Sequence, residues 1–208
     1  MNKISWIAVL VALIIISLIF LKENKETTYR APLKEQAVIL AFGDSLTYGY
    51  GAPQELSYPS ILEKKTGLHV INAGVNGEES SEGLRRLPTF LKQKPDLVIL
   101  CHGGNDIIGK LSKEALKKNL LSMIQLIQES GAEVLLVGVP NFGMLGFQTD
   151  GIYYEIADET DVMFEDKVLS FVEQNNIYKS DYIHPNAKGY EMMADAFIDI
   201  LQKNKIVP

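Results

Sequence analysis

Four short apolar segments constrain the fold of this chain more than any other feature of its sequence. They lie at residues 37–42, 68–71, 97–101 and 134–139. Short runs without regular polar alternation are typical of strands that are buried on both faces of a parallel sheet. Segments of helical periodicity separate these runs. The alternation predicts an α/β fold in which helices cover both faces of a parallel sheet.

The helix predicted at 112–130 has the clearest periodicity. Its apolar face is formed by Leu116, Leu120, Met123, Ile124 and Ile127. Ser112 can cap its first turn and Gly131 can end it. The other segments of helical pattern lie at 58–65, 80–91, 159–174 and 187–202. Pro88 predicts an interruption in the second of these helices. A fifth strand, between the last two, would be short and lie near Ile177.

Polar and glycine-rich segments follow three of the predicted strands. In an open parallel sheet the carboxyl ends of the strands share one edge, and ligands bind there. This edge should therefore carry Gly-Asp-Ser at 43–45, Asn-Ala-Gly at 72–74 and Gly-Gly-Asn-Asp at 103–106.

Ser45 has two interpretations on local grounds. A serine that follows a buried strand and begins a helix is exposed and can act as a nucleophile. Serine is also a preferred N-cap residue. This segment alone does not decide between catalysis and capping.

Asp181 and His184 stand three residues apart, just before the predicted helix at 187–202. One loop could then supply a general base and the carboxylate that orients its second ring nitrogen. Taken alone, a surface aspartate and a surface histidine are the simpler interpretation.

Two further positions could bind a negatively charged oxygen. Asn105 can present its side-chain amide to an oxyanion, and Gly74 can present a backbone N–H. Glycine and asparagine also favour turns, so each signal is weak alone. They gain weight because four such signals occur in order, each at the place that the predicted fold requires.

These four segments together resemble the GDSL (SGNH) hydrolase family, in particular its compact bacterial thioesterase I/lysophospholipase L1 and arylesterase branch. The matching segments are Phe-Gly-Asp-Ser-Leu-Thr at 42–47, Asn-Ala-Gly-Val-Asn-Gly at 72–77, Gly-Gly-Asn-Asp at 103–106 and Asp-Tyr-Ile-His-Pro at 181–185. The resemblance covers about residues 37–202. It implies a three-layer flavodoxin-like fold with no metal and no organic cofactor.

The resemblance also implies a role for each matched residue. Ser45 would be the nucleophile, His184 its general base and Asp181 the partner of that base. The oxyanion hole would consist of the backbone N–H groups of Ser45 and Gly74 and the side chain of Asn105. The segment 141–156 is where a substrate-binding loop is expected.

The implied substrate is a small acyl ester or thioester, with lipids among the candidates. Relatives hydrolyse acyl thioesters, aryl esters, lysophospholipids and acetylated sugars, and fold and triad do not choose among these. A non-catalytic, membrane-tethered binding module is the alternative function. A nucleotide-binding domain is excluded, because 49–51 lacks the third glycine of a dinucleotide fingerprint and no Gly-Lys-Ser/Thr phosphate loop occurs.

Composition excludes several other classes of protein. The formal net charge is −6, and no basic run occurs of the kind that nucleic-acid binding needs. Cys101 is the one cysteine, so an intrachain disulfide is excluded. Its apolar neighbours predict a core residue rather than a reactive thiol. Metal-binding patterns such as CxxC and HExxH are missing. The sequence does not indicate an oligomeric state.

The N-terminus carries an apolar run at 4–21 after a short positive start. A membrane span needs about 20 apolar residues, and no small-residue cleavage site follows. We expect residues 1–21 to be an uncleaved membrane anchor, with a cleaved signal segment as the alternative. Residues 22–36 would be a linker and 37–208 the hydrolase domain. The positive start places the domain on the extracytoplasmic side, although the basic residues after the run oppose this orientation.

Overall fold

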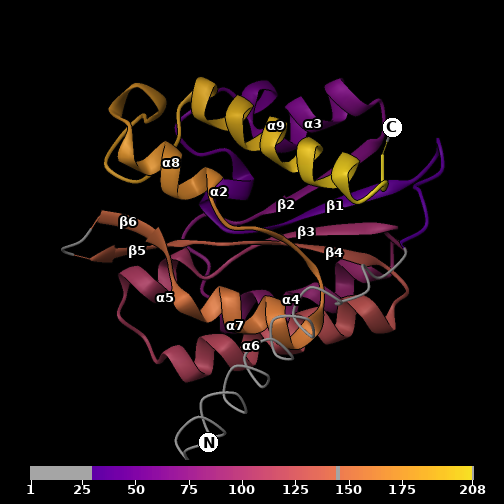
Figure 1. The fold of residues 1–208 in the computed structure, drawn as a ribbon, viewed down its shortest axis with the longest axis horizontal. Helices are drawn as coiled ribbons and strands as arrows, with labels where there is room; N and C mark the ends of the chain where they lie inside the picture. The colour runs from indigo at the N-terminus through magenta and orange to yellow at the C-terminus, as the bar shows by residue number, and fades with distance from the viewer. Residues whose placement is uncertain (1–29, 144–145, 208) are drawn as a thin grey trace, which may run out of the picture.

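A five-stranded parallel sheet with the order β2-β1-β3-β4-β7 forms the centre of the molecule. The structure, a computed structural model, describes residues 30–143 and 146–207. The strands are β1 Val38–Gly43, β2 His69–Gly74, β3 Leu97–Cys101, β4 Glu133–Val137 and β7 Met163–Glu165. Helices cover both faces of the sheet (Figure 1). The predicted α/β architecture with a parallel sheet is thus confirmed.

The helices form two layers (Figure 1). One layer contains α2 Ser45–Tyr48, α3 Tyr58–Thr66, α8 Val168–Gln174 and α9 Ala187–Lys203. The other contains α4 Ser80–Leu91, α5 Gly104–Ile108, α6 Lys113–Glu129 and α7 Gly151–Thr160. Within the layers, α3 and α8 pack against α9, and α4 and α7 pack against α6. Two 3₁₀ helices, η1 Gln54–Leu56 and η2 Asn176–Tyr178, lie in the loops of the first layer.

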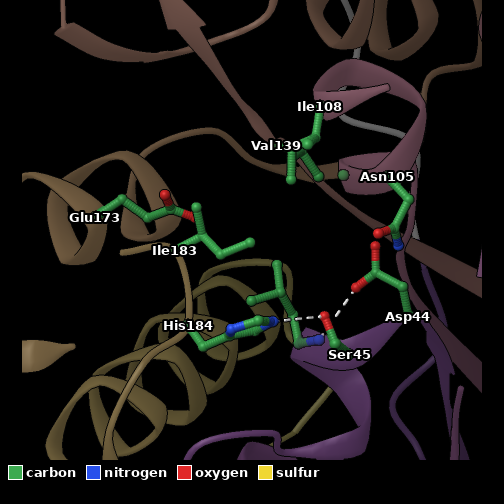
Figure 2. A pocket seen from close by; sticks show the side chains of 10 residues that line it. Asp44, Ser45, Asn105, Ile108, Val139, Glu173, Ile183 and His184 are labelled. Carbon is green, nitrogen blue, oxygen red and sulfur yellow. Dashed lines mark hydrogen bonds between the residues drawn. The ribbon is translucent and has the colours of Figure 1, made fainter. Parts of the chain in front are cut away.

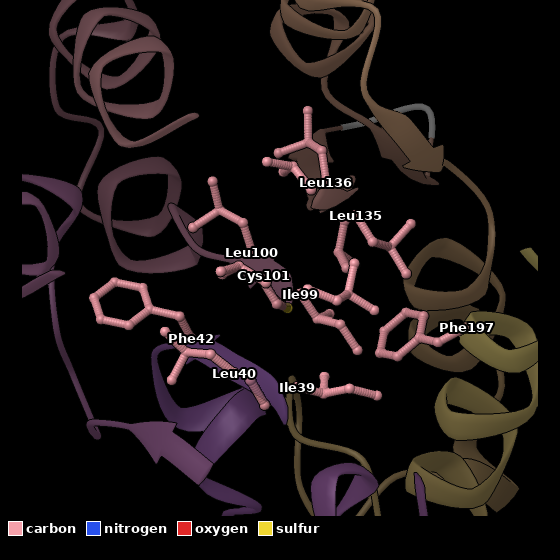
Figure 3. Close-up of a cluster of buried hydrophobic side chains, with 14 of the residues drawn as sticks. Ile39, Leu40, Phe42, Ile99, Leu100, Cys101, Leu135, Leu136 and Phe197 are labelled. Atoms are coloured by element: carbon pink, nitrogen blue, oxygen red, sulfur yellow. The ribbon is translucent and has the colours of Figure 1, made fainter. Parts of the chain in front are cut away.

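The core is built on the three central strands. Side chains of β1, β3 and β4 are almost entirely buried, and Phe197 of α9 packs onto them from one side (Figure 3). Burial on both faces explains why these strands are continuous apolar runs, since each fully buried aliphatic side chain stabilises the fold by about 1.5–3 kcal/mol. Cys101 is fully buried among them, as its neighbours predicted.

Helix α6 follows the sequence prediction closely. All five residues of its predicted apolar face are buried. The Ser112 hydroxyl caps the helix by accepting a hydrogen bond from the Ala115 N–H at 3.2 Å. The interruption predicted in α4 is wrong, because the helix runs through Pro88. Pro88 is exposed, so water can bind the carbonyl group that loses its helical partner.

The region between residues 150 and 186 differs from the prediction. A single helix at 159–174 was expected, but α7, β7 and α8 occupy this region. Asp161 ends α7 in a left-handed conformation with φ 51°, and Met163 then pairs with Leu135 of β4. The fifth strand is therefore β7. Ile177 lies in η2 and is 69% exposed.

An antiparallel hairpin follows β4. It consists of β5 Pro140–Gly143 and β6 Gly146–Thr149. A substrate-binding loop was expected over 141–156, and this segment instead contains the hairpin and the first part of α7. The hairpin lies at the same end of the molecule as α5 and α8 (Figure 1).

The last residues of the predicted linker contact the domain at the amino ends of the strands. Arg30 Nε lies 3.1 Å from Glu133 Oε2, at the first residue of β4. The Leu33 N–H donates to the Ile206 carbonyl at 2.8 Å. The predicted anchor at 1–21 lies outside the described residues. Within the described part of the chain, no helix is long and apolar enough to span a bilayer.

Candidate active site

The register of the sheet brings the predicted segments together. Gly43 at the end of β1 pairs with Gly74 of β2 on one side and with Cys101 of β3 on the other. The segments that follow the three strands therefore start at one edge. Gly43 is required for this arrangement, because a Cβ at this position would lie 2.0 Å from the Cys101 carbonyl oxygen.

The capping residue of α2 is Asp44. Its Oδ1 accepts a hydrogen bond from the Leu46 N–H at 3.1 Å. Ser45 is the first residue of the helix, and its hydroxyl is used elsewhere: Ser45 Oγ lies 3.1 Å from His184 Nε2. Of the two interpretations of Ser45, capping is thus excluded by the residue before it.

Asp181 and His184 contact each other within their loop. His184 Nδ1 lies 2.8 Å from Asp181 Oδ2. The second carboxylate oxygen, Asp181 Oδ1, accepts the backbone N–H groups of Ile183 and His184 at 2.9 and 2.8 Å. Burial raises the pKa of the Asp181 carboxyl, but these hydrogen bonds outweigh burial, so its pKa lies below the ordinary value. The carboxylate is therefore ionised at neutral pH and can accept a hydrogen bond from His184 Nδ1.

A tyrosine ring from outside this loop packs against the imidazole and helps to hold it in place. Tyr50 packs on it with 4.5 Å between the ring centroids. Tyr50 is itself held from α9, since the Tyr190 hydroxyl donates to the Tyr50 carbonyl at 2.7 Å. The loop is fixed at its other end by Asn186, whose side-chain amide donates to the Ile177 and Lys179 carbonyls.

A small pocket opens beside Ser45 (Figure 2). Its cavity volume is about 20 Å³, which is room for one or two water-sized groups. Aliphatic side chains form most of the wall, namely Leu46, Ile108, Val139 and Ile183. Asn105, His184 and Glu173 provide polar atoms around it. An ester carbonyl between Ser45 and Asn105 would thus have an apolar cavity next to it.

Two of the three predicted oxyanion donors, Asn105 and Gly74, differ in position. Asn105 lines the pocket, and its Nδ2 donates one hydrogen bond to the Glu78 carbonyl at 2.9 Å. The second N–H of this amide is the one that can serve an oxyanion. Gly74 is not among the residues that line the pocket, and its N–H donates to Asn72 Oδ1 at 3.0 Å. Its predicted role would require this hydrogen bond to be given up.

Gly74 has a packing function of its own. A Cβ at this position would lie 2.0 Å from the Tyr48 backbone nitrogen. The end of β2 therefore lies very close to the short helix that carries Ser45. Any residue with a side chain at position 74 would prevent this close approach. The structure brings Ser45, His184 and Asn105 to one pocket, and Asp181 contacts His184 without lining that pocket. Gly74 lies against the short helix that carries Ser45.

Comparison with known proteins agrees with this geometry. Residues 41–192 match the model of the GDSL-like lipase/acylhydrolase family. The chain belongs to this family. An arylesterase of Vibrio mimicus is 31% identical over 180 residues, which cover 80% of this chain and 88% of the relative. Thioesterase 1/protease 1/lysophospholipase L1 of Escherichia coli is 32% identical over 187 residues, which cover 84% and 87%.

Solved structures give the same result. The psychrotrophic esterase EstA from Pseudoalteromonas sp. superposes with a TM-score of 0.72 at 25% identity, over 81% of this chain and 98% of its own. AlinE4, an SGNH-hydrolase family esterase, is 34% identical with a TM-score of 0.64 over 82% and 97%. The resemblance that the four sequence segments indicated is confirmed, and ester hydrolysis is the general activity that this membership supports.

Behind Asn105, this acylhydrolase has a buried polar cluster that the sequence did not reveal. Glu78 Oε2 lies 2.6 Å from Arg86 and 3.1 Å from His102 Nε2. The Gly103 N–H donates to His102 Nδ1 at 3.0 Å, so the proton of a neutral ring lies on Nε2 and points at Glu78. Arg86 stacks on Phe42 with 4.2 Å from its guanidinium carbon to the ring centroid. His102 is thus structural and does not line the pocket.

The two aspartates of the matched segments, Asp44 and Asp106, support the loops. Asp44 caps α2, and its burial raises the pKa of its carboxyl above the ordinary value. Asp106 accepts hydrogen bonds from the Ser80 backbone N–H at 2.8 Å and the Ser80 hydroxyl at 2.6 Å, so it holds the start of α4. Within residues 30–143 and 146–207, no group of three or more metal-ligating side chains occurs.

Sequence reasoning also missed Glu173, which lines the pocket from α8. A signal was present, because the buried positions of α8 are Val168, Leu169, Val172 and Glu173. A charged residue at a position of the apolar face is uncommon and marks either a buried partner or a ligand. The signal was lost because 159–174 was treated as one continuous helix.

The Glu78 cluster predicts a particular dependence of stability on pH. Burial raises the pKa of Glu78, but hydrogen bonds from His102 and Arg86 outweigh it and lower the pKa to about 2. The ionised carboxylate therefore stabilises the fold above its ordinary pKa, and this contribution is lost as the pH falls toward about 2. We expect Glu78→Gln to lower the free energy of unfolding at pH 7, with a difference from wild type that shrinks between pH 4.5 and 2.

Urea unfolding at pH 7, 4 and 3 measures this difference. Glu129→Gln is the matched control, because Glu129 is an exposed glutamate at the end of α6. It should change stability by less than about 0.5 kcal/mol at each pH. If the free energy of unfolding of Glu78→Gln differs from that of wild type by the same amount at pH 7, 4 and 3, the charge on Glu78 does not stabilise the fold.

Proposed function

We propose that the chain hydrolyses a carboxylic ester or thioester through an acyl-enzyme on Ser45. The observation that carries this proposal is the continuous line of contacts from Ser45 Oγ to His184 Nε2 and from His184 Nδ1 to Asp181 Oδ2, at 3.1 and 2.8 Å. With the ring proton on Nδ1, His184 donates to Asp181, and Nε2 can accept the proton of the Ser45 hydroxyl.

The reaction then has two stages. Ser45 Oγ attacks the carbonyl carbon while its proton moves to His184 Nε2, and the same proton is delivered to the leaving alcohol or thiol. Water next gives a proton to His184 Nε2 while its oxygen attacks the acyl carbon. The intermediate then expels Ser45 Oγ, which takes the proton back from His184 Nε2 as the acid is released. Asp181 stabilises the imidazolium that forms in each stage.

Asn105 supplies the hydrogen bond that stabilises the developing oxyanion. Its side chain is held by the Glu78 carbonyl, so the amide is oriented before the substrate arrives. A donor that needs no reorganisation at the moment of reaction stabilises the transition state more than a mobile one. The backbone N–H groups of Ser45 and Gly74 are proposed as additional donors, the latter after release from Asn72.

The names of the relatives and the size of the pocket support a proposal for the substrate class. The Vibrio protein is named an arylesterase, and the Escherichia protein a thioesterase and lysophospholipase. An apolar cavity of about 20 Å³ supports a small acyl group rather than a long chain. We therefore propose small acyl esters and thioesters as substrates. A non-catalytic binding module has no observation in its favour, because it needs no serine–histidine contact.

Replacement of the nucleophile tests the proposal directly. Ser45→Ala should abolish hydrolysis of p-nitrophenyl butyrate and labelling by a fluorophosphonate probe, because only one oxygen is lost and no nucleophile remains. Ser130→Ala, at the C-terminus of α6, is the control and should be labelled like the wild type. Wild-type turnover by Ser45→Ala would end the serine-hydrolase assignment.

Removal of the oxyanion donor should affect the chemical step. We expect Asn105→Ala to lower kcat by about 10²–10³ with a smaller change in KM, since one hydrogen bond is lost in the transition state. Steady-state kinetics measures both parameters, and thermal unfolding checks that the loop remains folded. If KM rises while kcat is unchanged, Asn105 binds the ground state, and its role is different.

We further propose that residues 4–21 tether the domain to a membrane, with the domain on the extracytoplasmic side. The length of the apolar run and the absence of a small-residue cleavage site support this proposal. A tether raises the local concentration of the enzyme near that membrane.

Mass spectrometry of the native protein tests the tether. The mature chain from the membrane fraction should begin before residue 4, and a chain that starts near Thr27 should be released into solution and keep its activity on water-soluble esters. A mature N-terminus after residue 21 would instead identify a cleaved signal segment.

A further inference from the structure

Glu173 has an environment that ionisable residues rarely occupy. Its side chain lines the pocket and is directed toward it, from the wall opposite Asn105 (Figure 2). The residue is only 2% exposed. Its Oε2 has no hydrogen-bond partner among the residues that the structure describes. Nearly all buried polar groups in proteins have a partner, so an unpartnered carboxyl oxygen on a buried residue that lines a pocket indicates a group that a ligand can complete.

The charge state of Glu173 limits which ligand can bind there. Burial raises the pKa of its carboxyl to about 8, although Lys179 lowers it, and Asp44 and Asp181 raise it further. The ammonium group of Lys179 is engaged by the Phe147 and Tyr182 rings, at 5.2 and 5.5 Å from their centroids. At neutral pH the carboxyl is therefore mostly protonated, and it can both donate and accept a hydrogen bond.

We propose that Glu173 is a specificity-determining residue that hydrogen-bonds a hydroxyl group of the substrate, close to the scissile ester. This inference rests on the proposed function of Ser45 as nucleophile. Apart from Asp44, Gly104 and the proposed catalytic groups, the remainder of the wall is aliphatic, so an unsubstituted acyl chain would leave the Glu173 carboxyl unpaired. A hydroxylated chain would satisfy it and still bury its carbon atoms against Ile108, Val139 and Ile183.

A neutral hydroxyl group fits this place better than a charged group. A cation in the pocket would oppose the imidazolium that must form on His184 during catalysis. An anion would face Asp44 as well as Glu173 in a buried environment. The hydroxyl could belong to the acyl chain or to the alcohol, because both parts of the ester lie near Ser45. A hydroxyl on the acyl chain and one on the alcohol would make the same hydrogen bond to Glu173. Esters that carry the hydroxyl on one part or the other distinguish the two.

Two series of esters test the proposal at pH 7. The acyl series consists of the p-nitrophenyl esters of butyrate, 2-hydroxybutyrate and 3-hydroxybutyrate. The alcohol series consists of the propyl, 2-hydroxypropyl and 2,3-dihydroxypropyl esters of butyrate. For wild type, we expect kcat/KM for a hydroxylated member of one series to exceed that of its unsubstituted ester by about tenfold, the value of one modest buried hydrogen bond.

Two variants separate recognition from general damage to the pocket. Glu173→Leu should reduce this preference to about one, because it removes the polar group and keeps the volume. Glu173→Gln should retain most of the preference, since its amide still donates and accepts. Urea unfolding of both variants shows that they fold, and Glu173→Leu should be the more stable of the two, because it leaves no polar group without a hydrogen-bond partner in this buried position.

The outcomes test the role of Glu173 separately from the role of Ser45 as nucleophile. Equal kcat/KM throughout both series for wild type, or a preference that Glu173→Leu retains, overturns the role of Glu173 and leaves Ser45 as nucleophile. A preference for butyrylcholine over the propyl ester that Glu173→Leu removes would show that Glu173 binds a cation, and this too overturns the proposal. Absence of hydrolysis of every ester by wild type overturns the proposed function and this inference with it.

Discussion

Strand β1 is hydrogen-bonded to β2 on one side and to β3 on the other, and its register places Gly43 between Gly74 and Cys101. The rest of the molecule depends on this close contact of three strand ends. The chain can leave β1 and turn directly into α2 only because no side chain stands at 43 or 74. Ser45 is thereby delivered to the edge of the sheet, where the loop with His184 can reach it.

Behind this edge, the position of Asn105 depends on charges that never contact the pocket. The Glu78 carbonyl accepts a hydrogen bond from Asn105, and the Glu78 side chain is held by Arg86 and His102. A buried carboxylate is tolerated when it is both paired and hydrogen-bonded, and removal of one partner is costly. The cluster therefore fixes the main chain at Glu78 and, through it, the amide that faces the substrate.

Sequence reasoning located the elements whose signals are local. The strands β1 and β3 are continuous apolar runs, α6 has a clear periodicity, and three of the four matched segments carry Ser45, Asn105, Asp181 and His184. The three-residue strand β7 could not be located in this way, since only its pairing with β4 distinguishes Met163–Glu165 from the surrounding helical pattern. Ile177 has the composition of a strand residue, yet it lies exposed in a 3₁₀ turn. The Glu78 cluster joins Glu78, Arg86 and His102, which come from different parts of the chain. A pattern of neighbouring residues does not predict such contacts.

The contact of Arg30 with Glu133 has a consequence for the direction in which the enzyme faces. It fixes the chain at the amino ends of the strands, whereas Ser45 lies at their carboxyl ends. Strand β1 has six residues, so at about 3.3 Å per residue these two edges are about 20 Å apart. The eight residues at 22–29 extend over at most about 28 Å. If residues 4–21 lie in a bilayer, the attachment point at Arg30 stays within this distance of it, and the catalytic edge lies on the opposite side of the domain, about 20 Å from the attachment point.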